Sequence, residues 1–136
     1  MKDMPMSPTE DKNKEIVRHV YQASASDPNA LASVMHEDFV EFVPPILPWG
    51  GVHRGLDVFK TTVMPLVAAA IDLSSLSLVS LSADGDRVAA LILGSSTSGK
   101  ELWIAEHWTL RDEKVLSIMV FYHDTTLLTP SSTAQR

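Results

Sequence analysis

The chain has 136 residues, enough for one domain with a hydrophobic core, and its 45% hydrophobic and 21% charged residues are typical of a globular protein. Its net charge of −6, without a Lys/Arg cluster, argues against a nucleic-acid partner, and the absence of cysteine excludes disulfides, thiolate nucleophiles and cysteine-ligated metals. No apolar run approaches the roughly 20 residues of a membrane span, and the N-terminus carries no apolar signal region. We therefore expect a cytoplasmic protein with no membrane partner.

The N-terminal part of the chain is expected to be helical after a flexible arm. Residues 1–12 show no periodicity and predict the arm. Apolar residues then recur at three- and four-residue spacing, which predicts a helix that ends near Ser26 and carries His19 on its apolar side. Asp27–Pro28 offers a helix cap and a first helical position, so a short second helix is predicted to about Met35.

One strand and a third helix follow. Phe39–Val43 alternates as a strand does and is closed by Pro44–Pro45. A loop rich in proline and glycine leads to a third helix, whose apolar side runs from Val58 to Val67 and which Pro65 is expected to kink.

From Asp72 the pattern changes to a period of two residues, which indicates β-strands. We predict four consecutive antiparallel strands, with Asp84–Gly85 as the hairpin turn between the first two. The last two strands lie between Glu101 and Asp124 and are joined by a tight turn at residues 111–114. Helices gathered before an antiparallel sheet predict an α+β domain.

The last predicted hairpin places acids on apolar faces. One face of its first strand holds Leu102, Ile104, Glu106, Trp108 and Leu110, and one face of its second strand holds Leu116, Ile118, Val120, Tyr122 and Asp124. An acid on an apolar face must be ionised at a cost, paired or kept protonated. Glu106 therefore either exchanges a proton with a substrate oxygen, or pairs with a buried cation or hydroxyl and only holds the sheet.

The element order and the stretches DPNALASVMHEDFVEFVPP, HRGLDVFKTTVMPL, IAEHW and VFYHDT resemble the nuclear-transport-factor-2-like (NTF2-like) superfamily, and within it the SnoaL-like and ketosteroid-isomerase-like proteins. The resemblance implies an NTF2-like cone, in which a curved antiparallel sheet wraps around N-terminal helices and encloses a pocket for a small apolar molecule. We expect a single domain over residues 13–128 and a flexible tail over residues 129–136. The superfamily includes isomerases, dehydratases, cyclases, epoxide hydrolases and non-catalytic binders, so the fold alone does not define a function.

Aligned without gaps, the resemblance places the family's oxyanion-hole tyrosine at His19, its general-base aspartate at Val43 and its protonated aspartate at Glu106. Because the base position holds no acid, steroid isomerisation by the familiar mechanism is not supported. Glu41, two residues before Val43 and on the same side of the strand, is a candidate for a displaced base; the alternative is that Glu41 faces solvent. The epoxide-hydrolase pattern requires an arginine where Ile104 stands.

Further candidate contacts with a substrate are Tyr122, Asp124, Trp49, His53, Trp108 and Val43. Tyr122 is expected to orient a substrate oxygen, and Asp124 to lie at the pocket mouth unless it only caps the strand end. Trp49 provides a flat apolar surface or a lid over the core, and His53 follows it in the same loop.

We predict cofactor-free acid–base chemistry, of isomerase, dehydratase or cyclase type, on an apolar substrate that carries a carbonyl or hydroxyl group. Glu106 would donate the proton, and His19 or Glu41 would act as the base. No metal or cofactor is expected, because zinc, serine-nucleophile, phosphate-loop and dinucleotide motifs are absent. The alternative is a non-catalytic ligand-binding or dimerisation module. We expect a homodimer through the outer sheet face, which carries Trp103, His107 and Thr109.

Overall fold

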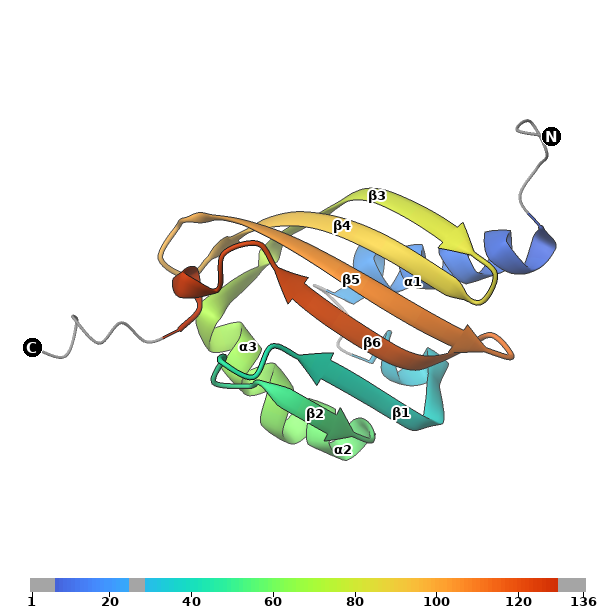
Figure 1. Cartoon of the computed structure of the whole chain (residues 1–136), viewed down its shortest axis with the longest axis horizontal. Coiled ribbons are helices and arrows are strands. Elements are labelled where there is room, and N and C mark those ends of the chain that lie inside the picture. The colour runs from blue at the N-terminus through green and yellow to red at the C-terminus, as the bar shows by residue number, and fades with distance from the viewer. Residues whose placement is uncertain (1–6, 25–28, 130–136) are drawn as a thin grey trace, which may run out of the picture.

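A six-stranded curved sheet carries the described helices on one of its faces (Figure 1). The structure, a computed structural model, describes residues 7–24 and 29–129. The strands follow the order β2-β1-β6-β5-β4-β3, and all neighbours are antiparallel except β1 and β6. Their bounds are β1 Met35–Val43, β2 Gly51–Arg54, β3 Ile71–Asp84, β4 Arg87–Ser96, β5 Glu101–Arg111 and β6 Lys114–Tyr122. The predicted α+β class and the run of four antiparallel strands are confirmed.

Helix α1, Pro8–Ser24, begins inside the segment predicted as a flexible arm. The cause is a capping box: the Ser7 hydroxyl accepts from the Glu10 N–H, and the Glu10 carboxylate accepts from the Ser7 N–H, each over 3.2 Å. The other oxygen of Glu10 accepts from the Gly85 N–H over 2.6 Å and ties the helix start to the β3–β4 turn. The predicted end near Ser26 and the helix start at Asp27–Pro28 lie outside the described residues; a short 3-10 helix, Ala32–Val34, follows them.

The buried stripe of α1 consists of Asn13, Ile16, Val17 and Val20. His19 is exposed, so its predicted place on the apolar side of the helix was wrong. The physical reason is helical geometry: His19 lies roughly 60° beyond Ile16 around the helix axis, past the edge of the stripe. Tyr21, at the opposite edge, is half-buried.

The predicted third helix is interrupted. It consists of α2, Leu56–Val58, a π-helical segment, Phe59–Val63, and α3, Met64–Ala70. Pro65 lies in the first turn of α3; it lacks an N–H, and its ring crowds the carbonyl four residues earlier. The expected distortion at Pro65 therefore takes the form of a wide π turn just before it.

Two strand details differ from the sequence prediction. Strand β2 was read as loop, since four residues between glycines are too few to show alternation; it pairs with β1 from Val40 opposite Arg54 to Val43 opposite Gly51. In β6 the register shifts so that Val115 pairs with Leu110 and Ser117 with Thr109, which leaves Leu116 as a bulge. The inner face of β6 is therefore formed by Val115, Ile118, Val120 and Tyr122 rather than by Leu116.

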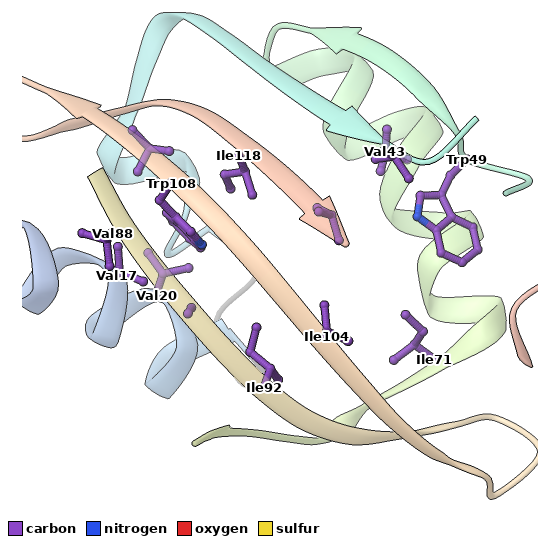
Figure 2. Packing of buried hydrophobic residues seen from close by; sticks show 14 of the residues in the cluster. Val17, Val20, Val43, Trp49, Ile71, Val88, Ile92, Ile104, Trp108 and Ile118 are labelled. Carbon is purple, nitrogen blue, oxygen red and sulfur yellow. The ribbon is translucent and has the colours of Figure 1, made fainter. Parts of the chain in front are cut away.

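The core lies between the concave face of the sheet and the helices (Figure 2). At one end Trp108 of β5 packs near Val17 and Val20 of α1, and at the other Trp49 lies beside Val43. Both tryptophans are 2% exposed. None of the described helices is long and apolar enough to cross a membrane.

Candidate functional site

One acid lies on the apolar inner face of β5, as the alternation of the sequence predicted. Glu106 stands between Ala90 of β4 and Val120 of β6 in the sheet register. The other members of its face are buried: Leu102, Ile104, Trp108 and Leu110. The sheet therefore holds the Glu106 carboxyl group toward the interior of the cone.

Two donors meet one oxygen of Glu106. The hydroxyl of Tyr21 on α1 donates to Oε1, and the indole Nε1 of Trp108 donates to the same atom over 3.2 Å. The rings of Tyr21 and Trp108 also contact each other, with centroids 5.7 Å apart. Among the described residues, none of the ion pairs includes Glu106. The sequence analysis considered a buried cation or a hydroxyl as the structural partner of Glu106. Among the described residues the partner is a hydroxyl, that of Tyr21.

Burial raises the pKa of Glu106 above its ordinary value, while the hydrogen bonds from Tyr21 and Trp108 act in the opposite direction. Protein surrounds the carboxyl group on all sides, yet the residue keeps an intermediate accessible surface. The Glu106 side chain is thus deeply enclosed by protein without being fully shielded from solvent. Tyr21 and Tyr122 are likewise deeply enclosed by protein and yet keep some accessible surface.

Glu41 of β1 also faces the interior. Its exposed fraction is 7%, and it alternates with Phe39 and Val43, whose exposed fractions are 1% and 5%. The alternative in which Glu41 faces solvent is therefore wrong. Its Oε1 atom has no hydrogen-bond partner among the described residues. Burial, followed by the charge of Glu106, raises the pKa of Glu41 to about 8, which favours the protonated carboxyl group at neutral pH.

Tyr122 and Trp49 form an aromatic corner beside the two acids. Tyr122 ends the inner face of β6, and its ring meets Trp49 edge to face at a centroid distance of 6.0 Å. Burial raises the pKa of Tyr122, and the charges of Glu106 and Glu41 act in the same direction. Both carboxyl groups are therefore close enough to Tyr122 to influence its hydroxyl.

The remaining candidates are divided between the interior and the surface. Val43 is buried in the core, and His53, opposite Glu41 in the β1–β2 register, contacts the Trp49 carbonyl oxygen through Nε2 at 2.7 Å. Asp124 accepts hydrogen bonds from the backbone and hydroxyl of Thr126, which lower its pKa, and caps the 3-10 helix Thr125–Leu127. The capping alternative for Asp124 is thus the arrangement observed. His19, exposed on α1, does not join the two carboxyl groups.

Tyr21 is the residue of this cluster that the sequence reasoning missed. The gap-free alignment placed the family's tyrosine two residues earlier, at His19. Tyr21 lies at the edge of the apolar stripe, and a phenol at such an edge was the available signal. Within the ranges 7–24 and 29–129, no three His, Asp or Glu side chains lie close enough together to hold a metal ion.

Comparison with known proteins agrees with this architecture. The sequence model of the SnoaL-like domain matches residues 16–118. No curated protein matches the chain. An NTF2-like protein from Burkholderia thailandensis is 24% identical, with a TM-score of 0.73, over 91% of this chain and 97% of the other. A candidate SnoaL-like polyketide cyclase from a Jannaschia species is 17% identical, with a TM-score of 0.73, over 94% and 99%.

A third solved structure, TerC co-crystallised with polyporic acid, is 22% identical with a TM-score of 0.69, over 85% of this chain and 93% of the other. At these identities the solved structures establish the fold, and the predicted NTF2-like cone is confirmed. The match to the domain model extends over most of the chain, from the middle of α1 into β6. The chain belongs to the SnoaL-like domain family.

Proposed function

We propose that this chain is an enzyme that performs acid–base chemistry without a cofactor on a small, mostly apolar substrate bearing a carbonyl or hydroxyl group. The observation that carries the proposal is the pair of interior carboxyl groups, Glu106 of β5 and Glu41 of β1, which lie close enough together for the charge of Glu106 to raise the pKa of Glu41. Two acids with unlike surroundings can divide the roles of proton donor and proton acceptor. Isomerisation, dehydration and cyclisation can all use such a pair.

The surroundings of the two acids support binding of an apolar molecule. Tyr21, Glu106 and Tyr122 are deeply enclosed by protein but keep some accessible surface, and we propose that they border the space in which the substrate binds. Trp49 and Trp108, each 2% exposed, pack against Tyr122 and Tyr21 and hold these two phenol rings in place. Two solved structures with this fold point in the same direction: one is described as a candidate SnoaL-like polyketide cyclase, and the other, TerC, was co-crystallised with polyporic acid.

The test is turnover of a panel of apolar ketones, esters and alcohols by the wild type and by Glu106→Gln. Because a positioned acid or base accelerates such reactions by roughly 10²–10⁴-fold, we expect the substitution to lower kcat by about that factor. Glu101→Gln is the matched control, since Glu101 lies on the same strand but is exposed. Turnover by Glu106→Gln equal to that of the wild type would contradict the proposal.

A second function, as a dimerisation or binding module, is favoured by a different observation. The outer face of β4, β5 and β6 carries exposed apolar side chains, including Leu91, Met119 and Phe121 with exposed fractions of 37%, 41% and 47%. His107 stacks edge to face on Phe121 at 5.8 Å. We propose that this outer face joins two copies of the chain, in an assembly compatible with either function of the interior.

A further inference from the structure

We propose that a second site, at the end of the molecule where α1 begins, binds a zwitterionic amino acid with an amide side chain, for which glutamine is the probe. This inference goes beyond the proposed function, because none of the residues that line the site belongs to the interior cluster of Glu106, Glu41, Tyr21 and Tyr122. Leu110, which lines it, lies four residues beyond Glu106 on β5, roughly 13 Å along the strand. The two sites are therefore separate, and each can be tested without the other.

The site is a pocket of about 490 Å³ between three segments that meet at one end of the molecule (Figure 1). These segments are the first turns of α1, the β3–β4 turn and the β5–β6 turn with the end of β5. The Glu10 carboxylate joins α1 to the β3–β4 turn through its hydrogen bond from the Gly85 N–H. The Leu110 N–H donates to the Asp86 carbonyl oxygen over 2.8 Å and joins the same turn to β5. These two bonds connect the three walls of the pocket.

Asn13 of α1 is the observation that marks this pocket as a binding site. The residue is 4% exposed, and its side-chain amide has no hydrogen bond within the described residues. Neither polar atom of the amide is completely shielded, and the small accessible surface of the residue borders the pocket. So deeply buried a polar group usually has a partner, because it has lost most of its hydration. The amide both donates and accepts, so a ligand with another primary amide would satisfy both of its polar atoms.

The rim of the pocket carries charges of both signs. Lys12 and Glu113 lie 3.9 Å apart and neutralise each other. Within residues 7–24 and 29–129, the other rim charges, Arg111, Asp86 and Asp112, take part in none of the ion pairs. A guanidinium group binds a carboxylate through two parallel hydrogen bonds, and an aspartate accepts from an ammonium group. An α-amino acid carries both groups on one carbon and matches this rim, whereas a simple anion would also meet two unpaired acids.

Glutamine carries the three groups that this arrangement calls for. Its side-chain amide pairs with the Asn13 amide, and its carboxylate pairs with Arg111. Its ammonium group then has Asp86 and Asp112 as acceptors, and Leu110 gives the pocket an apolar surface for the carbon chain. The pocket volume lies within the range of about 300–1,000 Å³ that small-molecule sites occupy, so the whole amino acid is accommodated.

The first experiment locates the binding site by NMR of the isotope-labelled full chain during a titration with L-glutamine. The proton–nitrogen signals of the Asn13 side-chain amide are assigned by their loss in Asn13→Asp. We expect these signals to shift saturably, together with the backbone amides of Asp86 and Asp112, while the backbone amides of Glu41 and Glu106 stay unchanged. The absence of a saturable shift, or shifts confined to other parts of the chain, would overturn the proposal.

The second experiment tests the ligand class with three analogues of glutamine that each lack one group, measured in the same titration. Norvaline has a methyl group in place of the amide, and we expect it to bind about tenfold more weakly, because the Asn13 amide is then left without a partner. Glutaramate lacks the ammonium group and γ-aminobutyramide lacks the carboxylate. Their contacts lie on the exposed rim, so we expect a smaller loss, of about threefold for each. Affinities equal to that of glutamine would overturn the ligand class.

The third experiment connects each group of the ligand with its residue. Asn13→Leu should abolish the preference for glutamine over norvaline and keep the preference over γ-aminobutyramide, and Arg111→Gln should do the reverse. If Asn13→Leu does not fold, Asn13→Asp makes the same test, since it keeps the shape of the side chain and loses the N–H donor. Arg54→Gln is the matched control, because Arg54 is an exposed arginine of β2 outside the pocket and its loss should leave every affinity unchanged. Preferences that are the same in the Asn13 and Arg111 variants as in the wild type would overturn the proposal.

Discussion

The buried carboxyl group of Glu41 should make the stability of the protein depend on pH. Its pKa is about 8 in the folded state and about 4.5 in the unfolded chain. Between these values the folded state binds more protons, so the free energy of unfolding falls as the pH rises, and it levels off on either side. Across this window the loss from Glu41 is on the order of 4 kcal/mol. We expect Glu41→Gln to remove it, so that the variant is the more stable protein above pH 8.

Urea unfolding at intervals from pH 5 to 9 measures this effect. The raised pKa of Glu106 also makes the free energy of unfolding fall as the pH rises, and this part of the decline should remain in the Glu41→Gln variant. The control is Glu37→Gln, which changes an exposed acid on the same strand and should leave the wild-type profile unaltered. Identical pH profiles for the wild type and Glu41→Gln would show that Glu41 is ionised in the folded state.

At the scale of single residues, the sequence predicted the inward position of Glu106 but not what Glu106 contacts. Alternation along a strand defines a face, and it placed Glu106 on an apolar face correctly, but it left open whether Glu41 faces the interior or solvent. The partner of Glu106 comes from α1, across the core, and the choice between His19 and Tyr21 depends on how the helix rotates against the sheet. That rotation is decided by tertiary packing, which helical periodicity alone does not specify.

At the scale of elements, the β5–β6 turn holds two non-glycine residues in an unfavourable backbone conformation. Its two central residues, Asp112 and Glu113, have φ of 52° and 63°, in the left-handed region that such tight hairpins require and that glycine and asparagine adopt most easily. Glu113 also lies 3.9 Å from the Lys12 ammonium, but both side chains are exposed, and such a pair contributes little. We expect the double substitution Asp112→Asn and Glu113→Gly to raise the free energy of unfolding by about 1 kcal/mol.

Urea unfolding of the double variant measures this change. The β3–β4 turn provides the opposite control, because Gly85 has a φ of 61° and Gly85→Ala should lower the free energy of unfolding by about 1 kcal/mol. If the β5–β6 variant were less stable than the wild type, the acidic side chains of the turn would have to form contacts that outweigh their backbone strain.

Elements with a strong local signal were predicted, and elements defined by their partners were not. The four long strands from Ile71 to Tyr122 alternate over many residues and were found. Strand β2 has four residues and exists because β1 offers it an edge. The bulge at Leu116 is likewise a property of the β5–β6 pairing, so it could not be read from β6 alone.

At the scale of the whole molecule, the two faces of the sheet differ in character. Its concave face, covered by α1 and α3, holds the acids, whereas none of the described helices covers its convex face (Figure 1). A stable protein–protein interface buries about 800 Å² on each partner, and its core is more apolar than the surface around it. The exposed side chains of Leu91, Met119 and Phe121 give the convex face this character.

We therefore expect a homodimer at micromolar concentration, measured by light scattering after size exclusion, and we expect Phe121→Asp to convert it to a monomer. Phe121 is 47% exposed and carries the His107 contact, so a charge there would be buried without a partner in the dimer but hydrated in the monomer. The control is Leu66→Asp on α3, an apolar residue that is 38% exposed on the helical side of the sheet and should leave the dimer intact. A monomeric wild type would show that the interface does not exist. A dimer that is lost with Leu66→Asp but kept with Phe121→Asp would show that the interface lies elsewhere. If the dimer is confirmed, Phe121→Asp also separates assembly from catalysis, because Glu106 and Glu41 lie on the opposite face of the same sheet and should keep their contacts in the monomer.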